Sequence, residues 1–105
     1  DPAVPKYSAS PQPAEIVVCT DVLEHVEPEC MTDVLADLRR CVKNVGYFGI
    51  PTFEALKTLP DGRNAHISVH DDSWWAETVS EAGFTLDEVE LLEMKRGIYL
   101  MMKVS

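Results

Sequence analysis

The sequence lacks the features of several protein classes. No apolar run approaches the ~20 residues of a membrane helix. Its 9 basic residues face 18 acidic ones, and the net charge of −9 makes nucleic acid an unlikely partner, because phosphate contacts need clustered Lys and Arg. Cysteines at CxxC spacing, typical of zinc and redox sites, are missing. We therefore expect a soluble, acidic protein that uses neither membrane nor nucleic acid.

The three cysteines, Cys19, Cys30 and Cys41, are odd in number and widely spaced. We interpret them as reduced thiols, which predicts a cytoplasmic protein, and we expect Cys19 and Cys41 in the core. No signal-peptide pattern is present, and the first residue is Asp1 rather than Met. We expect the chain to be processed, trimmed or a fragment.

The composition indicates one domain with a short arm. A chain of 105 residues can bury a core but is short for a complete doubly wound sheet. Residues 1–13 contain four prolines, which disfavour helix, and we expect an extended arm there. Residues 14–105 are expected to form a partial α/β domain.

A buried strand followed at once by polar residues organises the chain. Residues 16–19 are Ile-Val-Val-Cys, and this unbroken apolar run predicts a strand buried on both faces. The polar residues that follow are Thr20, Asp21, Glu24, His25 and Glu27. Open α/β sheets bind ligands just beyond the carboxyl ends of their strands. We therefore expect a site at residues 20–27.

The next elements predict a parallel crossover. Apolar residues at helical spacing predict an amphipathic helix from Pro28 to Lys43, with Asn44 or Gly46 in the left-handed conformation at its end. A short strand at residues 47–50 follows. Strand, helix and strand in this order favour a right-handed parallel connection.

The long connection at residues 52–69 follows this second strand and shows no clear periodicity, apart from a possible turn of helix at residues 53–56. Because it also begins at the carboxyl end of a parallel strand, we expect it to lie beside residues 20–27, where it could act as a lid. Lys57, Arg63 and Asn64 in this connection are candidates for binding an anionic or polar substrate, although an ordinary exposed loop explains them equally well.

The last third of the chain predicts a helix and a hairpin. Asp71, Asp72 and Ser73 are candidate N-caps of a helix that runs to Ala82 and is closed by Gly83. In this helix we expect Trp75 in the core and Trp74 partly exposed, since adjacent helix positions point about 100° apart. Residues 86–94 and 98–104 read as antiparallel strands joined by a turn at residues 95–97.

The segment Cys19 to Val26, Cys-Thr-Asp-Val-Leu-Glu-His-Val, resembles the fourth-strand motif of class I S-adenosylmethionine-dependent methyltransferases of the ubiquinone-biosynthesis type. The helix ending in Leu-Arg-Arg at residues 38–40, the Ala-Gly-Phe at residues 82–84 and the terminal hairpin support the resemblance. It implies a partial, three-layer Rossmann-like α/β fold with a mixed sheet, corresponding to the carboxyl-terminal half. It also implies the strand order first, second, fourth, third, which leaves residues 16–19 as an edge strand.

The resemblance also implies roles for individual residues. The methyl donor, S-adenosylmethionine, would be lined by Cys19, Thr20, Asp21 and Val22, and Asp1 could be the remnant of the acid that holds its ribose. The histidine of the motif lies near the substrate, which carries over to His25. Asp21 and His25 are thus candidate catalytic residues, with Glu24 beside them as a possible base. A solvated loop with a helix-capping acid is the simpler interpretation.

The glycine-rich GxGxG loop of the family has no counterpart among the five glycines of this sequence. We therefore expect this chain alone to bind the methyl donor weakly or not at all and to be inactive alone. The alternative is a non-catalytic interaction module that associates through its exposed strand edge, for example as a homodimer.

A metal site formed by His66, His70, Asp71 and Asp72 is not expected. Residues 65–69 read as extended, and four extended residues separate the two histidines by roughly 13 Å. One ion cannot bridge that distance, and capping explains the two aspartates. No metal ligands are predicted.

Overall fold

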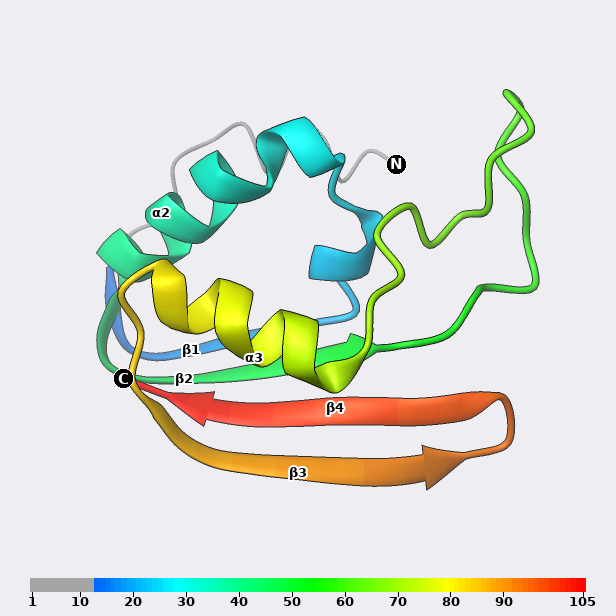
Figure 1. Ribbon diagram of the computed structural model, residues 1–105. Helices are drawn as coiled ribbons and strands as arrows, with labels where there is room; N and C mark the ends of the chain where they lie inside the picture. Colours follow the sequence, from blue (N-terminus) through cyan, green and yellow to red (C-terminus); the bar gives the residue numbers. More distant parts are fainter. Residues whose placement is uncertain (1–12) are drawn as a thin grey trace.

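The fold is a four-stranded mixed sheet with two α-helices (Figure 1). The computed structural model describes residues 13–105, so Asp1 and the predicted arm, except Pro13, lie outside the described residues. The elements in chain order are β1 (Ala14–Thr20), the 3₁₀ turns η1 (Leu23–His25) and η2 (Pro28–Cys30), α2 (Met31–Cys41), β2 (Val42–Pro51), α3 (Asp72–Glu81), β3 (Leu86–Met94) and β4 (Gly97–Val104).

The strand order is β1-β2-β4-β3, as the family resemblance implied. β1 and β2 are parallel and are connected through α2, which confirms the parallel crossover. β4 is antiparallel to both β2 and β3, and a turn at residues 95–96 joins β3 to β4 in the predicted hairpin. Within the described sheet, β1 is an edge strand, also as expected.

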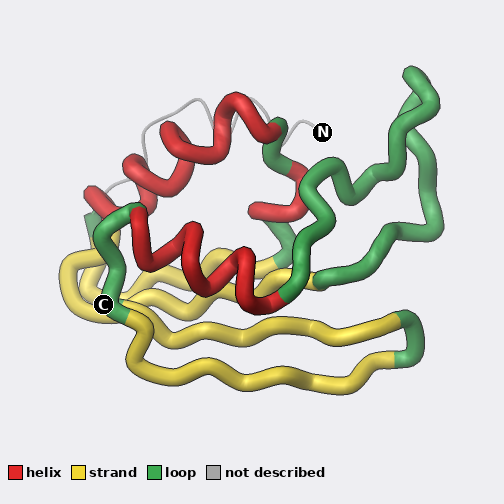
Figure 2. Tube along the Cα trace, in the orientation of Figure 1, coloured by secondary structure: helices red, strands yellow, loops and turns green. Residues whose placement is uncertain are grey.

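Both helices lie over the same face of the sheet (Figures 1 and 2). The core is formed there by Phe48 of β2, Met102 of β4 and residues of both helices, including Leu35 and Trp75. Trp75 is fully buried, which confirms its expected place. The described residues thus supply the sheet and one helical layer of the expected three-layer fold.

The opposite face of β1 is bare in the described structure. Ile16 and Val18 are 60% and 66% exposed, whereas Cys19, whose side chain points to the helical side, is 7% exposed. The prediction that residues 16–19 are buried on both faces is therefore wrong for the described structure, because both helices cover the other face.

The end of α2 also differs from the prediction. η2 forms the beginning of the predicted helix, and α2 then ends at Cys41, where Val42 is already extended. Asn44 and Gly46 lie inside β2, so neither is the predicted left-handed cap. The physical reason is pairing with β1, whose Ala14 already lies opposite Val42.

The second helix follows the sequence prediction closely. Asp71 is its N-cap, and its carboxylate accepts a hydrogen bond from the Trp74 N–H at 2.8 Å. Gly83, with φ of +102°, follows its end in the left-handed region. Trp74 is half-buried, as expected. No helix within residues 13–105 is both long enough and apolar enough to cross a membrane.

Candidate functional site

The chain bends sharply at the end of β1. Asp21 has a left-handed backbone with φ of 58°, a conformation that aspartate tolerates better than most residues. Its N–H donates to the Gly49 carbonyl at 3.0 Å, and its Oδ1 accepts a hydrogen bond from the Tyr99 hydroxyl at 2.9 Å. Gly49 permits this contact, since a Cβ there would lie 2.6 Å from the Tyr99 hydroxyl oxygen.

Tyr99 is a site residue that sequence reasoning missed. It comes from β4, the only neighbour of β2 besides β1 among the described strands, and reaches across β2 to Asp21. Burial raises its pKa, and its hydrogen bond to the Asp21 carboxylate adds to the effect. The phenol therefore stays protonated and holds Asp21 in place.

The connection at residues 52–69 packs against η1, as the sequence predicted. The Ser68 N–H donates to the Glu24 carbonyl at 2.9 Å, and the buried Ser68 hydroxyl donates to the Val26 carbonyl at 2.7 Å. Arg63 reaches Glu27 with a 2.9 Å ion pair. These bonds attach the connection to the turn that follows β1.

Asn64 organises this connection internally. Its Oδ1 accepts hydrogen bonds from the N–H groups of Ala55 and His66, both at 2.9 Å, and its Nδ2 donates to the Ala55 carbonyl at 3.0 Å. The turn of helix considered for residues 53–56 is absent, because these bonds hold the backbone in an irregular path. Both ends of the Asn64 amide are thus occupied within the loop.

The two other candidate substrate residues are solvent-exposed. Arg63 also contacts Asp61 at 2.8 Å, so two carboxylates share its charge, and these contacts lower the pKa of Glu27 and of Asp61. Lys57 is exposed on the same connection. A substrate role for Lys57, Arg63 and Asn64 stays a prediction.

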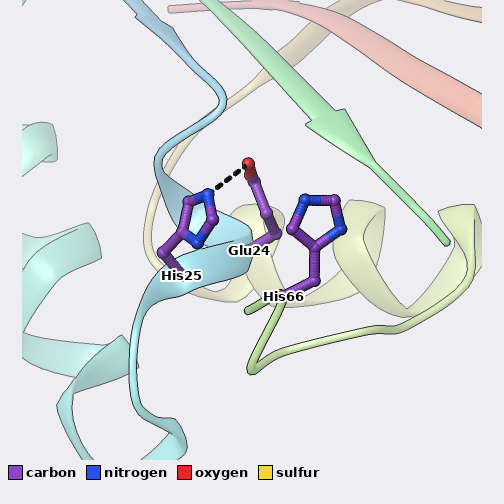
Figure 3. A group of neighbouring side chains, drawn as sticks. All are labelled: Glu24, His25 and His66. Carbon is purple, nitrogen blue, oxygen red and sulfur yellow. Dashed lines mark ion pairs between the residues drawn. The ribbon is translucent and has the colours of Figure 1, made fainter. Parts of the chain in front are cut away.

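Glu24, His25 and His66 form a compact group (Figure 3). One donor atom from each lies within 4.8 Å of the others, and His25 Nε2 approaches Glu24 Oε2 to 3.3 Å. The two imidazole rings meet edge to face with centroids 5.2 Å apart. His70, four residues from His66 in the sequence, stacks on Trp74 at 3.5 Å between centroids.

Backbone carbonyls fix the proton positions on both rings. His25 Nδ1 lies 2.8 Å from the Ala65 carbonyl oxygen, and His66 Nδ1 lies 2.6 Å from that of Phe53. A carbonyl oxygen only accepts, so each Nδ1 carries the proton. In the neutral rings, each Nε2 therefore bears a lone pair. Figure 3 shows one His66 nitrogen turned toward Glu24 and the other turned away.

The Glu24 carboxylate is the least compensated group of the site. The residue is 1% exposed, and neither carboxylate oxygen has a hydrogen-bond partner among the described residues. The 3.3 Å approach of His25 is a contact without hydrogen-bond geometry. Burial raises the pKa of Glu24, and the nearby charge of Asp21 adds a smaller increase.

The residues expected to line a methyl donor lie at the open edge of the sheet. Thr20 and Asp21 are exposed there, and Val22 is half-buried against the core. Cys19 and Cys41 are core residues, as predicted, and burial raises the pKa of Cys19 to about 12. The Cys19 thiol is thus protonated and inert at neutral pH.

No protein-family model matches the sequence, and no curated protein is detectably similar to it. Solved structures do match. The 1,6-didemethyltoxoflavin-N1-methyltransferase of Burkholderia thailandensis, with bound S-adenosylhomocysteine, is 20% identical with a TM-score of 0.68 over 93% of this chain. The magnesium protoporphyrin IX methyltransferase of Synechocystis, with bound S-adenosylmethionine, is 11% identical with a TM-score of 0.65 over 93%. This chain has part of the class I methyltransferase fold.

The chain spans 47% of the Burkholderia methyltransferase and 41% of the Synechocystis methyltransferase. An S-adenosylmethionine-dependent methyltransferase from Mesorhizobium loti matches with a TM-score of 0.59 at 11% identity, and this chain covers 63% of it. The partial methyltransferase fold that the motif at residues 19–26 implied is thus confirmed. Within this fold, the polar group lies beyond the carboxyl end of β1.

Proposed function

We propose that this chain forms one wall of the site of an S-adenosylmethionine-dependent methyltransferase in the cytoplasm. The observation that carries the proposal is the fold itself, together with structural neighbours that hold S-adenosylmethionine or S-adenosylhomocysteine. The methyl donor would lie against Cys19, Thr20, Asp21 and Val22 at the end of β1. The bend at Asp21, stabilised by Tyr99, supports this placement.

The arrangement beyond β1 suits the chemistry of methyl transfer. A nucleophilic oxygen or nitrogen of the acceptor attacks the methyl group of the sulfonium, and the acceptor then loses a proton. A neutral His25 with its lone pair on Nε2 is suited to take that proton, and Asp21 and Tyr99 help to shape the adjoining wall. Lys57 and Arg63 would meet a polar or anionic acceptor from the facing connection.

Binding of the methyl donor by this chain alone should be weak, since its sequence contains no GxGxG loop. The test is a titration of the ¹⁵N-labelled full chain with S-adenosylhomocysteine, followed through amide chemical shifts. We expect shifts confined to residues 19–22 and their neighbours. Thr20→Arg should abolish them, whereas Thr32→Arg on the exposed side of α2 should not. Shifts centred elsewhere, or shifts at residues 19–22 that are insensitive to Thr20→Arg, would overturn the proposal.

A non-catalytic role in association is the second candidate, favoured by the bare edge strand. β1 ends the described sheet and exposes Ile16 and Val18, and unpaired strand edges promote association. A homodimer through β1 would pair this edge and cover both side chains.

Substituting Val18→Lys should make the chain monomeric if β1 mediates association, because a charged side chain on an edge strand disfavours pairing. Val89→Lys is the matched control, since Val89 is 49% exposed on β3 at the other edge. Sedimentation velocity over a range of concentrations measures the outcome. An unsubstituted chain that is already monomeric, with residues 16–19 unprotected in hydrogen exchange, would contradict this role.

A further inference from the structure

We propose that Glu24, His25 and His66 bind a divalent transition-metal ion of the Zn²⁺ type. The donor set is two imidazole nitrogens and one carboxylate, gathered within 4.8 Å from η1 and from the connection that packs on it. The site can be tested without methyl transfer, so the two proposals can fail separately. A bound ion would occupy His25 Nε2, so His25 could take the acceptor's proton only in the metal-free chain.

The spacing of the donor atoms fits a shared ion. Two ligands about 2.1 Å from one zinc ion at the tetrahedral angle lie about 3.4 Å apart. His25 Nε2 and Glu24 Oε2 are 3.3 Å apart, and His66 lies within the 4.8 Å limit of the group.

Both histidines are oriented as metal-binding histidines usually are. In such sites one ring nitrogen binds the metal while the other donates to a carbonyl or carboxylate. Here the carbonyls of Ala65 and Phe53 hold the two Nδ1–H groups at 2.8 and 2.6 Å. The lone pairs on Nε2 are thereby left for another partner.

An ion would resolve two unfavourable features of the described structure. First, His25 Nε2 lies 3.3 Å from Glu24 Oε2 without forming a hydrogen bond. Second, the Glu24 carboxylate is buried with no hydrogen bond, which is costly unless a charge or metal compensates it. A cation between these groups turns both features into favourable contacts.

The donor types indicate the class of metal. Imidazole nitrogen favours Zn²⁺ and its first-row neighbours, whereas Mg²⁺ and Ca²⁺ prefer oxygen ligands. Three protein ligands also leave at least one coordination position open, which is typical of catalytic rather than structural zinc sites. From the sequence we excluded a metal site of His66 with His70, because extended backbone separates them, whereas the structure brings His66 beside His25 of η1.

Calorimetric titration of the full chain with Zn²⁺, in a Cys30→Ser background, tests the proposal. The substitution removes an exposed thiol that would bind zinc by itself. We expect one ion per chain, with binding at least ~10-fold weaker in Glu24→Gln and in His66→Gln, which remove ligands. Asn64→Ala, which loosens the connection that carries His66, should weaken binding by about 10- to 100-fold. Mg²⁺ should not compete.

His70→Gln is the matched control, because His70 lies four residues from His66 but contacts Trp74 instead. It should bind zinc like the parent chain. Circular dichroism verifies that each variant is folded, and Glu24→Gln in particular should fold, since it removes a buried charge. Absence of a stoichiometric ion, an effect of His70→Gln equal to that of His66→Gln, or full binding by Glu24→Gln would overturn the proposal.

Discussion

Replacing Glu24 with methionine should stabilise the metal-free chain by up to about 1–4 kcal/mol, the range seen when apolar residues of similar volume replace buried ion pairs. Glu24 is 1% exposed and its carboxylate oxygens have no hydrogen-bond partner among residues 13–105. The cost of removing the carboxylate from water therefore exceeds the stabilisation that its surroundings return, and its pKa is raised. Methionine fills a similar volume and needs no partner. If replacing Glu24 stabilises the chain, this carboxylate does not serve the stability of the fold, which is typical of residues that bind a ligand.

The stability advantage of Glu24→Met over the parent chain should grow with pH. Burial raises the pKa of Glu24 above its value in the unfolded chain, so the folded state keeps the proton to higher pH. Its contribution to stability is then present in full below the unfolded pKa and is lost as the pH rises through the folded one. The Glu24→Met variant lacks this loss, and its advantage should be largest at neutral pH and above.

Urea unfolding of both chains across the acidic to neutral range, with a chelator present, measures this difference. Glu29→Met is the control, because Glu29 is an exposed acid of the neighbouring turn η2. The same concentration of Zn²⁺ should then stabilise the parent chain by more than it stabilises Glu24→Met, because the variant lacks one ligand. A Glu24→Met chain less stable than the parent in metal-free solution would show that the carboxylate is satisfied.

Truncation of Trp75 should cost about 3–5 kcal/mol of the free energy of unfolding, as for other fully buried aromatic residues. Trp75 is 0% exposed, lies in the cluster that joins α3 to the sheet, and its indole N–H has no hydrogen-bond partner among residues 13–105. Its contribution is therefore packing alone. In a domain of typical stability, this loss would leave much of the chain unfolded near physiological temperature.

Trp74→Ala is the matched control, one position along the same helix. Trp74 is half-buried and stacks on His70, so its truncation should cost only about 1 kcal/mol. Chemical denaturation of both variants gives the comparison. Equal losses, or a greater loss for Trp74→Ala, would mean that α3 packs with a different face on the sheet.

Much of the scaffold was predictable because its signals are local. The apolar run at residues 16–19, the Asp71 cap and the turn at residues 95–96 each determine an element within a few residues. The position of the site also followed from a general rule, since polar residues after two parallel strands meet at one edge of the sheet. The hydrogen bond from the Ser68 N–H to the Glu24 carbonyl confirms that the two polar segments lie side by side.

The details of the site depend on long-range contacts that no local pattern encodes. His66 was compared with its neighbour His70, whereas the hydrogen bonds of Asn64 and Ser68 bring it to η1. The sequence already predicted that residues 52–69 lie beside residues 20–27. Had each histidine been checked against that prediction, His66 would have been paired with His25. No sequence pattern indicated that the Glu24 carboxylate is buried without a hydrogen-bond partner. Its burial depends on how the connection at residues 52–69 packs against η1.

Segments distant in the sequence hold His25 and His66 in one preorganised site beyond β1. Long-range ¹⁵N–¹H correlation spectra of the imidazole rings, recorded on the metal-free chain at mildly alkaline pH, test it most directly. The structure predicts that both rings are the Nδ1–H tautomer, with Nε2 unprotonated, because the Ala65 and Phe53 carbonyls accept from Nδ1. His70 serves as the internal comparison. Nε2–H tautomers, or rings averaging between tautomers as in free histidine, would contradict the site.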